Sequence, residues 1–480
     1  MIARSAEAST RGASTEIVRQ HKNADPLLHP FERAREYARA VRAVKLDRMF
    51  AKPFIGAMDD HADSVTCAST SPASLVAFVT GAADGEVIVW DLASRVKLWS
   101  VYAHERVVKS VAVARDGATF FSAGDDKTIK RWRMAAHEAL AAGGGGGGGG
   151  GDGAAGGVGW RKHSDARSRG GGVAPLRVWS GRAAFTSVDA HWRDVERFAT
   201  SSTSAVELWD ASRAEPVSAF EWGADTVTSV RWNPAETSVL ASTSADRGVV
   251  LYDARMAVPL RKATLALASN AVAWNPREPM NFTVANEDHC LYSFDMRKLA
   301  AATAVHKDHT GPVMDVHYAP TGREFVSGGY DKTVRLWATA GAGAGAAAGR
   351  SRDIYHTSRM QRVFVVRFTP DARFVISGSD DANVRVWKAR ASEALARQLP
   401  RERAAADYRG ALKKKFAHLP EVRRIANFRR LPKAVKSATA RAHDEAQVVR
   451  RKAANVRLHS KPGAVPGVSI REKPVVSVKS

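Results

Sequence analysis

Cysteine is scarce in this chain of 480 residues, and long apolar runs are missing. The two cysteines, Cys67 and Cys290, stand in strand-like segments, which favours buried free thiols in a reducing compartment over a disulfide or a metal site. No run of about 18 apolar residues is present to cross a bilayer, so no membrane association is expected. The first residues lack an apolar core and include Glu7 and Glu16, which argues against a secretory signal and leaves a transit peptide as an alternative.

Acidic residues are scarce in the last part of the chain. Residues 388–480 contain 24 Lys and Arg against 7 Asp and Glu, which is +17 of the total net charge of +23. Residues 1–58 carry +5, and the long central stretch of residues 59–387 carries +1. The cationic character therefore belongs to the ends of the chain, above all to the C-terminal end, and the centre is nearly neutral.

The neutral central stretch repeats one pattern of side chains. A Ser or Thr, an Asp and a Trp stand at offsets of minus ten, minus six and zero from the Trp, with a His further upstream. The four full copies are Thr80, Asp84 and Trp90 with His61; Ser122, Asp126 and Trp132 with His104; Ser327, Asp331 and Trp337 with His309; and Ser377, Asp381 and Trp387 with His356. The three weaker copies are Ser242, Asp246 and Tyr252; Asp288 and Phe294, with Val284 in the hydroxyl position; and Trp209, with Thr203 in the Asp position.

The spacing of these seven copies predicts the fold. Four of the six intervals between their aromatic residues are 42 or 43 residues, and a period of roughly 40 to 45 with His and Trp-Asp marks is typical of WD-repeat propellers. The two longer intervals contain glycine-rich inserts, residues 143–172 and 341–349, which we expect to be surface loops. The predicted fold class is an all-β seven-bladed WD-repeat propeller over residues 52–387, with an N-terminal helical segment within residues 1–51 and a basic α-helical extension over residues 388–480.

The polar residues of the repeat suit a structural role. A buried Trp indole needs an acceptor, which the Ser or Thr hydroxyl supplies; the hydroxyl donates to the His, and the other His nitrogen donates to the Asp. A recurring Ser, His and Asp also suggests a hydrolase triad, but an enzyme needs one nucleophile, and this set occurs four times. Polyglycine without a following Lys-Ser or Lys-Thr does not make a phosphate-binding loop. We therefore expect no catalysis, no cofactor or metal, and no small-molecule substrate.

The N-terminal segment supplies a strand that the last repeat lacks. Residues 31–48 alternate Arg with apolar residues at helix-compatible spacing, and the short apolar run Lys52–Met58 follows. After Trp387 the sequence turns helical at once, so the last repeat has no fourth strand of its own. We predict that Lys52–Met58 pairs as the outer strand of this repeat, which closes the ring and removes exposed edges.

The basic tail contains three stretches predicted to be helical, in which apolar stripes alternate with clustered cations, so these helices are expected to dock on a partner. The candidate binding residues are Lys413, Lys414, Lys415, Arg423, Arg424, Arg429, Arg430, Arg450, Arg451 and Lys452. Clustered Lys and Arg are typical of nucleic-acid binding, since each neutralised phosphate releases counterions. A nuclear or nucleolar import signal without RNA contact is the alternative, and both roles are compatible.

The segments that flank the repeats resemble the Sof family of WD-repeat nucleolar proteins. The resemblance rests on DPLLHPFERAREYARAVRAVKLDRMFAKPFIGAMDDH at residues 25–61, FDMRKL at 294–299 and LPEVRRIANFRRLPKAV at 419–435. It implies a non-catalytic scaffold of the small-subunit processome, which matures small-subunit ribosomal RNA in the nucleolus. The implied partners are processome proteins and the particle formed by the box C/D small nucleolar RNA and precursor ribosomal RNA.

The same resemblance implies a second function. Family members also count as substrate receptors of a cullin-RING ubiquitin ligase, whose receptors often end consecutive repeats with W-D-x-R. Here Asp253 and Arg255 follow Tyr252, and Asp295 and Arg297 follow Phe294, so the Trp is missing in both. Arg255 and Arg297 are the candidate adaptor-binding residues. The structural alternative is that Asp and Arg end an ordinary third strand.

Overall fold

The computed structural model of the chain describes most of the two extensions and of the repeats. The described residues are 31–134, 174–221, 225–256, 258–339, 349–395, 397–461, 464–465, 467 and 469–479. The polar lead before residue 25 and the predicted surface loops of the two glycine-rich inserts, apart from Gly349, lie outside these ranges. No helix among the described residues combines the length and apolarity needed to cross a membrane.

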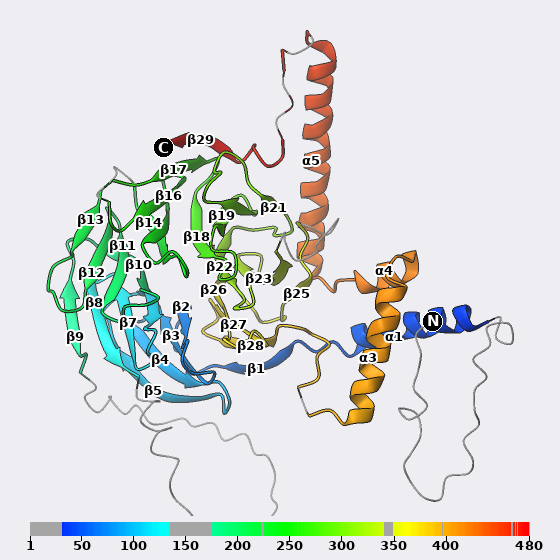
Figure 1. Ribbon diagram of the computed structural model, residues 1–480, viewed down its shortest axis with the longest axis horizontal. Helices are drawn as coiled ribbons and strands as arrows, with labels where there is room; N and C mark the ends of the chain where they lie inside the picture. Colours follow the sequence, from blue (N-terminus) through cyan, green and yellow to red (C-terminus); the bar gives the residue numbers. More distant parts are fainter. Residues whose placement is uncertain are drawn as a thin grey trace, which may run out of the picture. The chain divides into compact units, whose positions relative to one another are not determined.

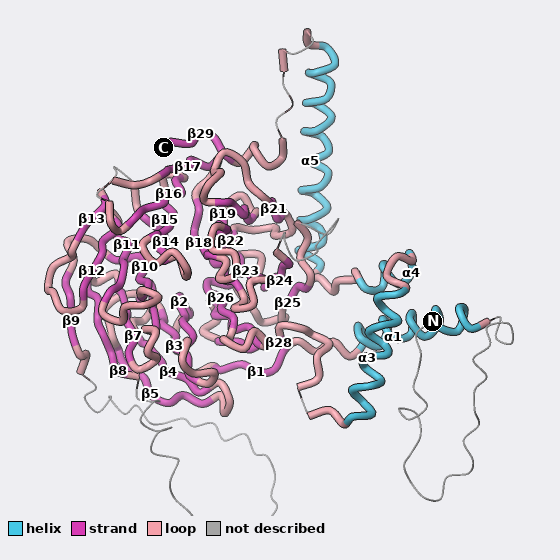
Figure 2. Tube along the Cα trace, in the orientation of Figure 1, coloured by secondary structure: helices cyan, strands magenta, loops and turns pink. Residues whose placement is uncertain are grey.

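The strands between residues 54 and 388 form seven antiparallel sheets, the blades of a propeller (Figures 1 and 2). Blade one contains β2 (Val65–Thr70), β3 (Ala77–Ala82), β4 (Glu86–Asp91) and β5 (Val96–Tyr102). Blade two contains β6 (Val108–Val113), β7 (Thr119–Gly124), β8 (Thr128–Arg133) and β9 (Arg177–Ser180). Blade three contains β10 (Phe185–Ala190), β11 (Arg197–Ser202), β12 (Val206–Asp210) and β13 (Ser218–Phe220).

The remaining blades follow in order. Blade four contains β14 (Val227–Trp232), β15 (Val239–Ser244), β16 (Gly248–Asp253) and β17 (Arg261–Leu265). Blade five contains β18 (Ser269–Trp274), β19 (Asn281–Asn286), β20 (Leu291–Asp295) and β21 (Ala304–His306). Blade six contains β22 (Val313–Tyr318), β23 (Glu324–Gly329), β24 (Val334–Ala338) and β25 (Asp353–Tyr355). Blade seven contains β26 (Val363–Phe368), β27 (Phe374–Ser379) and β28 (Val384–Lys388).

Two further strands come from the extensions. Strand β1 (Phe54–Met58) pairs with β28 as the outer strand of blade seven, so the predicted closure is confirmed. Strand β29 (Val475–Lys479) pairs antiparallel with β17 and makes blade four five-stranded, which the sequence pattern did not predict. The innermost strands contact one another in sequence from β2 to β26, and β26 contacts β2. The all-β seven-bladed propeller predicted from the repeat period is thereby confirmed.

The innermost strand of every blade carries the same irregularity. Its register against the second strand shifts after its first residue, so the second residue bulges. In blades four and five this bulged residue bonds to the next blade: Thr228 Oγ1 donates to the Ser269 carbonyl at 2.8 Å, and Asn270 Nδ2 donates to the Val313 carbonyl at 2.9 Å. Thr66 and Thr186 make the equivalent bond. The repeat thus links neighbouring blades as well as shaping each one.

The predicted polar network of the repeat is complete in two copies. In blade two Trp132 Nε1 donates to Ser122 Oγ at 3.0 Å, and His104 links Ser122 (2.8 Å) to Asp126 (3.0 Å). In blade six Trp337, Ser327, His309 and Asp331 make the same chain at 2.8, 2.7 and 2.9 Å. The Ser122 and Ser327 residues are fully buried and accept from an indole, so these hydroxyls are structural links between strands.

The other copies keep only part of the network. In blade one Trp90 and His61 both bond Thr80 at 2.7 Å, but Nδ1 of His61 has no partner among the described residues. In blade three the acceptor for Trp209 is Thr200 at 2.9 Å, nine residues before the Trp, a position that the ten-residue frame missed. The expectation that one four-membered chain repeats throughout was therefore too simple.

The helices come from the two ends of the chain. α1 (Glu32–Met49), α3 (Pro400–Lys415) and α4 (Pro420–Ala426) pack together as one compact unit, and α5 (Lys433–His459) is a separate helix of 27 residues. Prolines at the first positions of α3 and α4 suit a helix start, because the missing N–H is one that a first turn leaves unbonded. The predicted N-terminal and C-terminal helices are confirmed. That α1 packs on α3 and α4 was not predicted.

Candidate nucleic-acid and partner interfaces

The three lysines at the end of α3 differ in their surroundings. Lys413 forms an ion pair with Asp47, and Lys415 pairs at 2.5 Å with Glu36, whose side chain is 5 % exposed. Both carboxylates belong to α1. Lys414 is exposed. Two of these three candidate RNA-binding residues therefore already have an internal partner, and their charge is largely neutralised within the helical unit.

The family-like segment around α4 is held by α1 as well. Tyr37 donates its hydroxyl to Glu421 at 2.7 Å and packs edge-on against Phe416 with ring centroids 6.0 Å apart. Arg48 donates to the carbonyl of Ala426, the last residue of α4, where a cation meets the negative end of the helix dipole. The acidic residues and Tyr37 of α1 thus position the C-terminal motif. Sequence reasoning missed this role because the partners lie 366 to 384 residues apart in the chain.

The arginines of this segment lie in and just after α4. Arg423 and Arg424 are exposed on the helix, and Arg430 is exposed beyond its end. Arg429 is half-buried and donates through Nη1 to the Ala426 carbonyl at 3.3 Å. Arg423, Arg424 and Arg430 are consequently the arginines of this segment that the structure exposes to solvent.

Helix α5 presents the strongest cluster of solvent-exposed cations. Arg450, Arg451 and Lys452 are all exposed, and among the described residues no carboxylate pairs with them. The helix contains seven Lys and Arg against two acidic residues. The same half of α5 exposes Val449 and Leu458, at 62 % and 78 %. A helix that exposes both cations and large apolar side chains is suited to bind a polyanion together with a protein surface.

The two candidate adaptor-binding arginines have closely matched settings. Arg297 pairs with Asp295 at 2.8 Å and Arg255 with Asp253 at 3.4 Å, and in each case the backbone N–H of the Arg donates to the same Asp at 3.0 Å. The guanidinium of Arg297 lowers the pKa of the Asp295 carboxyl. Both arginines follow the third strand of neighbouring blades and are 74 % and 69 % exposed for Arg255 and Arg297. The two settings differ at Nη2, which in Arg255 donates to Ser238 Oγ at 2.6 Å and in Arg297 to Asp295 at 2.8 Å. The arginines are thus two exposed cations at equivalent positions of adjacent blades.

Neither cysteine is placed for chemistry. Cys67 is a buried free thiol and Cys290 a half-buried one, and burial raises the pKa of both to about 12. Within the described ranges no cluster of three or more His, Cys, Asp or Glu side chains is arranged to hold a metal ion.

A closed ring of seven WD-type blades with a basic helical extension defines the class as a WD-repeat scaffold protein. The profile of the WD domain, G-beta repeat, matches residues 53–91, 95–133, 215–253, 302–338 and 354–388, and that of the Sof1-like domain matches residues 389–475. DDB1- and CUL4-associated factor 13 of Danio rerio is 43 % identical over 478 residues, covering 100 % of this chain and 99 % of that protein. The human protein of the same name is 41 % identical over the same length and coverage. Protein SOF1 of Saccharomyces cerevisiae is 38 % identical over 487 residues, covering 99 % of this chain and 94 % of that protein.

The chain therefore belongs to the Sof1-like family of WD-repeat proteins, as its flanking motifs predicted. This family consists of nuclear scaffold proteins of ribosome biogenesis, so the predicted role in ribosome biogenesis is confirmed at that level.

Proposed function

We propose that this protein is a non-catalytic scaffold of the small-subunit processome in the nucleolus, and that α5 anchors it to the particle formed by precursor ribosomal RNA and the box C/D small nucleolar RNA. The observation that carries the proposal is the contrast in charge. Residues 59–387 carry +1, whereas α5 exposes Arg450, Arg451 and Lys452 without an internal carboxylate partner in the described structure. The blades offer surfaces for processome proteins, and the helix offers the RNA-binding cations.

The α5 cluster ranks above the other candidates for a physical reason. Using Lys413 or Lys415 to bind a phosphate would first break an ion pair with α1, which removes part of the binding free energy. A second set of exposed cations consists of Lys414, Arg423, Arg424 and Arg430. Arg429 is half-buried and donates to the Ala426 carbonyl. We expect these residues to add to affinity and α5 to dominate it.

The role of α5 as the anchor can be tested by replacing its three clustered cations with alanine. The R450A/R451A/K452A variant keeps the helix, because Ala has the highest helix propensity, and should lose co-sedimentation with pre-ribosomal particles in moderate salt. Three exposed cations of the blades, changed in K109A/R193A/R323A, remove the same charge elsewhere and serve as the matched control. If the α5 variant co-sediments as the wild type does, α5 is not the anchor.

This variant also separates RNA binding from nuclear import. A variant that remains nucleolar but leaves the particle has lost a particle contact, whereas a variant that stays in the cytoplasm has lost an import signal. Deleting residues 400–480 should likewise abolish co-sedimentation, but it also removes α3, α4 and strand β29, so the charge variant isolates the cause better.

A second candidate function is substrate reception for a cullin-RING ubiquitin ligase. It is favoured by the name of the vertebrate relatives, DDB1- and CUL4-associated factor 13, and by the exposure of Arg255 and Arg297 at equivalent positions of adjacent blades. We expect R255A/R297A to abolish capture of DDB1 by the purified protein, and R277A, another exposed arginine, to leave it unchanged. Unchanged capture by the double variant would remove these two residues from the adaptor contact.

A further inference from the structure

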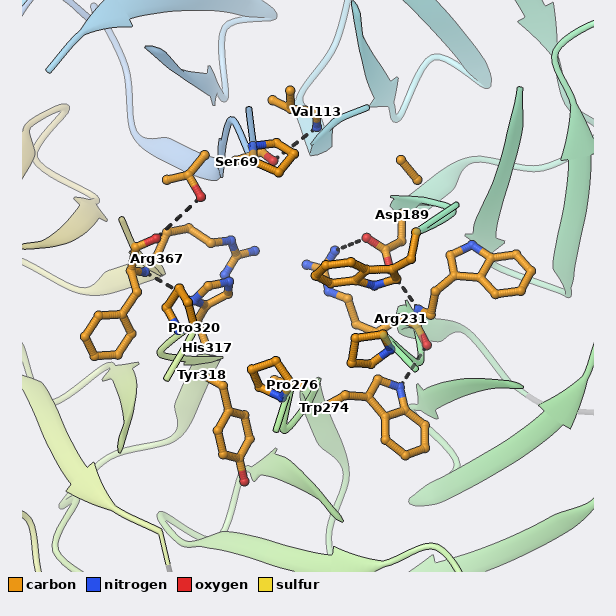
Figure 3. A pocket seen from close by; sticks show the side chains of 18 of the residues that line it. Ser69, Val113, Asp189, Arg231, Trp274, Pro276, His317, Tyr318, Pro320 and Arg367 are labelled. Carbon is orange, nitrogen blue, oxygen red and sulfur yellow. Dashed lines mark hydrogen bonds and ion pairs between the residues drawn. The ribbon is translucent and has the colours of Figure 1, made fainter. Parts of the chain in front are cut away.

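A cavity of about 480 Å³ lies on the axis of the propeller, where the innermost strands end (Figure 3). Its mouth is formed by the loops that connect the first and second strands of the blades. At the second position after the innermost strand, five blades place a proline, namely Pro72, Pro234, Pro276, Pro320 and Pro370. The two exceptions are neighbours: blade two has Arg115 and blade three has Trp192, and the guanidinium stacks over the indole at 4.8 Å. At this position the mouth is therefore lined by five prolines and by one cation stacked on an aromatic ring.

Polar side chains at the ends of the innermost strands line the cavity below its mouth. The residue before the end of the innermost strand is Asp189 in blade three, Arg231 in blade four, His317 in blade six and Arg367 in blade seven, and all four line the cavity. Figure 3 shows Arg231 and Arg367 extending into the opening from opposite sides. Ser69 of blade one lies beside Arg367's half of the ring.

Both guanidinium groups keep donors unused. Arg367 donates through Nε to the Ala68 carbonyl at 3.0 Å and through Nη1 to Asp315 and to its neighbour's carbonyl, while Arg231 donates through Nη1 to Asp189 at 3.3 Å. Among the described residues, Nη2 of each arginine has no hydrogen-bond partner. Burial is the main cause that lowers the pKa of Arg367; the charge of Asp315 opposes this shift, and the charge of Arg231 adds to it. Each of the two cations therefore has one carboxylate partner, Asp189 for Arg231 and Asp315 for Arg367, and within the described structure still has Nη2 free to donate.

We propose that this mouth binds an acidic peptide segment, with one Asp or Glu carboxylate entering to accept from Nη2 of Arg231 and Nη2 of Arg367. A carboxylate has two oxygens and matches guanidinium donors in geometry and charge. The prolines and Trp192 contact the apolar flanks of the segment. The lining that the structure describes for this site includes no residue of α5 and neither Arg255 nor Arg297. Those two arginines lie at the same end of the blades as the mouth, because the first and third strands of an antiparallel sheet end on the same side.

A peptide fits this mouth better than a nucleic acid does. The loops between the first and second strands of the seven blades together carry five Arg and six Asp or Glu. Such a rim offers no continuous cationic track for a phosphate backbone, which single-strand binding requires. The unused Nη2 donors of Arg231 and Arg367 lie inside the cavity, where they suit one inserted carboxylate side chain.

The test uses the full chain and a fluorescein-labelled ten-residue peptide of alternating Asp and Ala. The basic tail binds acidic peptides too, so the decisive comparison is between variants with an unchanged tail. D189N/R231Q replaces the ion pair with a neutral pair of similar shape, which avoids a buried unpaired charge. We expect the variant to bind the peptide about tenfold more weakly in fluorescence anisotropy, while R277Q, an exposed arginine of the same rim, binds as the wild type does.

A photo-crosslinking version of the peptide tests the site on the unaltered protein. Crosslinks should map to the loops of residues 71–76 and 191–196, and a ten-nucleotide oligouridylate should not displace the peptide from them. Equal affinity of D189N/R231Q and wild type, or crosslinks confined to other regions, would overturn the proposal. Displacement by the oligouridylate that is lost in the same variant would assign the site to RNA instead.

Discussion

At the scale of single residues, the Asp of the repeat stabilises a turn in most copies and binds a His in only some of them. Its carboxylate accepts the N–H two residues on in the turns at Asp84, Asp126, Asp246, Asp288 and Asp331, at 2.9 to 3.1 Å. The following residue adopts the left-handed region, as at Lys332 with φ 60°, and an Asp-capped turn favours this shape. Only in blades two and six does the same Asp also bind a His among the described residues.

This difference predicts unequal costs for the same substitution. Asp331 is almost fully buried and binds His309, Arg335 and Thr333, so D331A leaves the buried guanidinium of Arg335 with only one more distant carboxylate in the described structure, that of Asp308 at 4.0 Å, and should lower the free energy of unfolding by about 3–5 kcal/mol. Asp84 stands at the equivalent position in blade one but contacts only a turn N–H there in the described structure, so D84A should cost about 1 kcal/mol. Urea midpoints of the two variants measure the difference. Equal shifts would contradict the assignment of the larger network to blade six.

At the scale of secondary-structure elements, β1 and β29 differ in whether the sequence pattern could predict their pairing. Strand β1 was predictable because blade seven visibly lacked an outer strand and an apolar segment preceded the first repeat. Strand β29 was not predictable, because blade four already had four strands and nothing in VVSVK specifies which edge it joins. Its partner is set by long-range contacts, including Val475 against the core around Leu265 and the bond from the Ala266 N–H to the Pro474 carbonyl at 2.9 Å.

Removal of this strand gives a local prediction. Deleting residues 474–480 exposes the edge of β17, so the amide of Ala266 should exchange with solvent much faster, and the amides of Thr264 and its neighbours should follow. The outer strand of blade three, β13, is the internal control and should keep its exchange rate. Hydrogen exchange followed by mass spectrometry resolves both peptides. Unchanged exchange in residues 261–266 would show that β29 does not stay paired in solution.

At the scale of the whole molecule, the blades and the basic tail differ in net charge and in the titratable groups that they bury. The blades balance their charges and bury several neutral histidines, whereas the tail concentrates cations on α5. Burial lowers the pKa of His61 and of His306 to about 4, well below the ordinary value near 6.5 that each regains on unfolding. The unfolded chain therefore binds protons on acidification that the folded chain does not. Stability is complete above about pH 6.5 and falls as the pH approaches 4.

The pH dependence is measurable for one histidine at a time. Between pH 7 and pH 5, His306 should account for a loss of about 2 kcal/mol in the free energy of unfolding, so H306Q should flatten the pH dependence by about that amount. The matched control H459Q changes an exposed histidine of α5 and should leave the dependence as it is in the wild type. Urea midpoints at the two pH values decide. An unchanged slope in H306Q would mean that His306 takes up a proton in the folded state.

Local pattern was sufficient for much of this protein. The period of Trp, Asp and His defined seven blades, because each blade is built from contacts between residues close in sequence, and the apolar stripes defined the helices. The charge imbalance located the cationic extension for the same reason, since composition needs no knowledge of pairing.

Three features depended on contacts between residues more than a hundred positions apart. The carboxylates of α1 neutralise Lys413 and Lys415, β29 joins blade four, and the closed ring brings Arg231 opposite Arg367. Each arises when separate segments meet in space, and the free energy of such a meeting depends on the shape and charge of both surfaces at once. A pattern confined to either segment contains only half of that information.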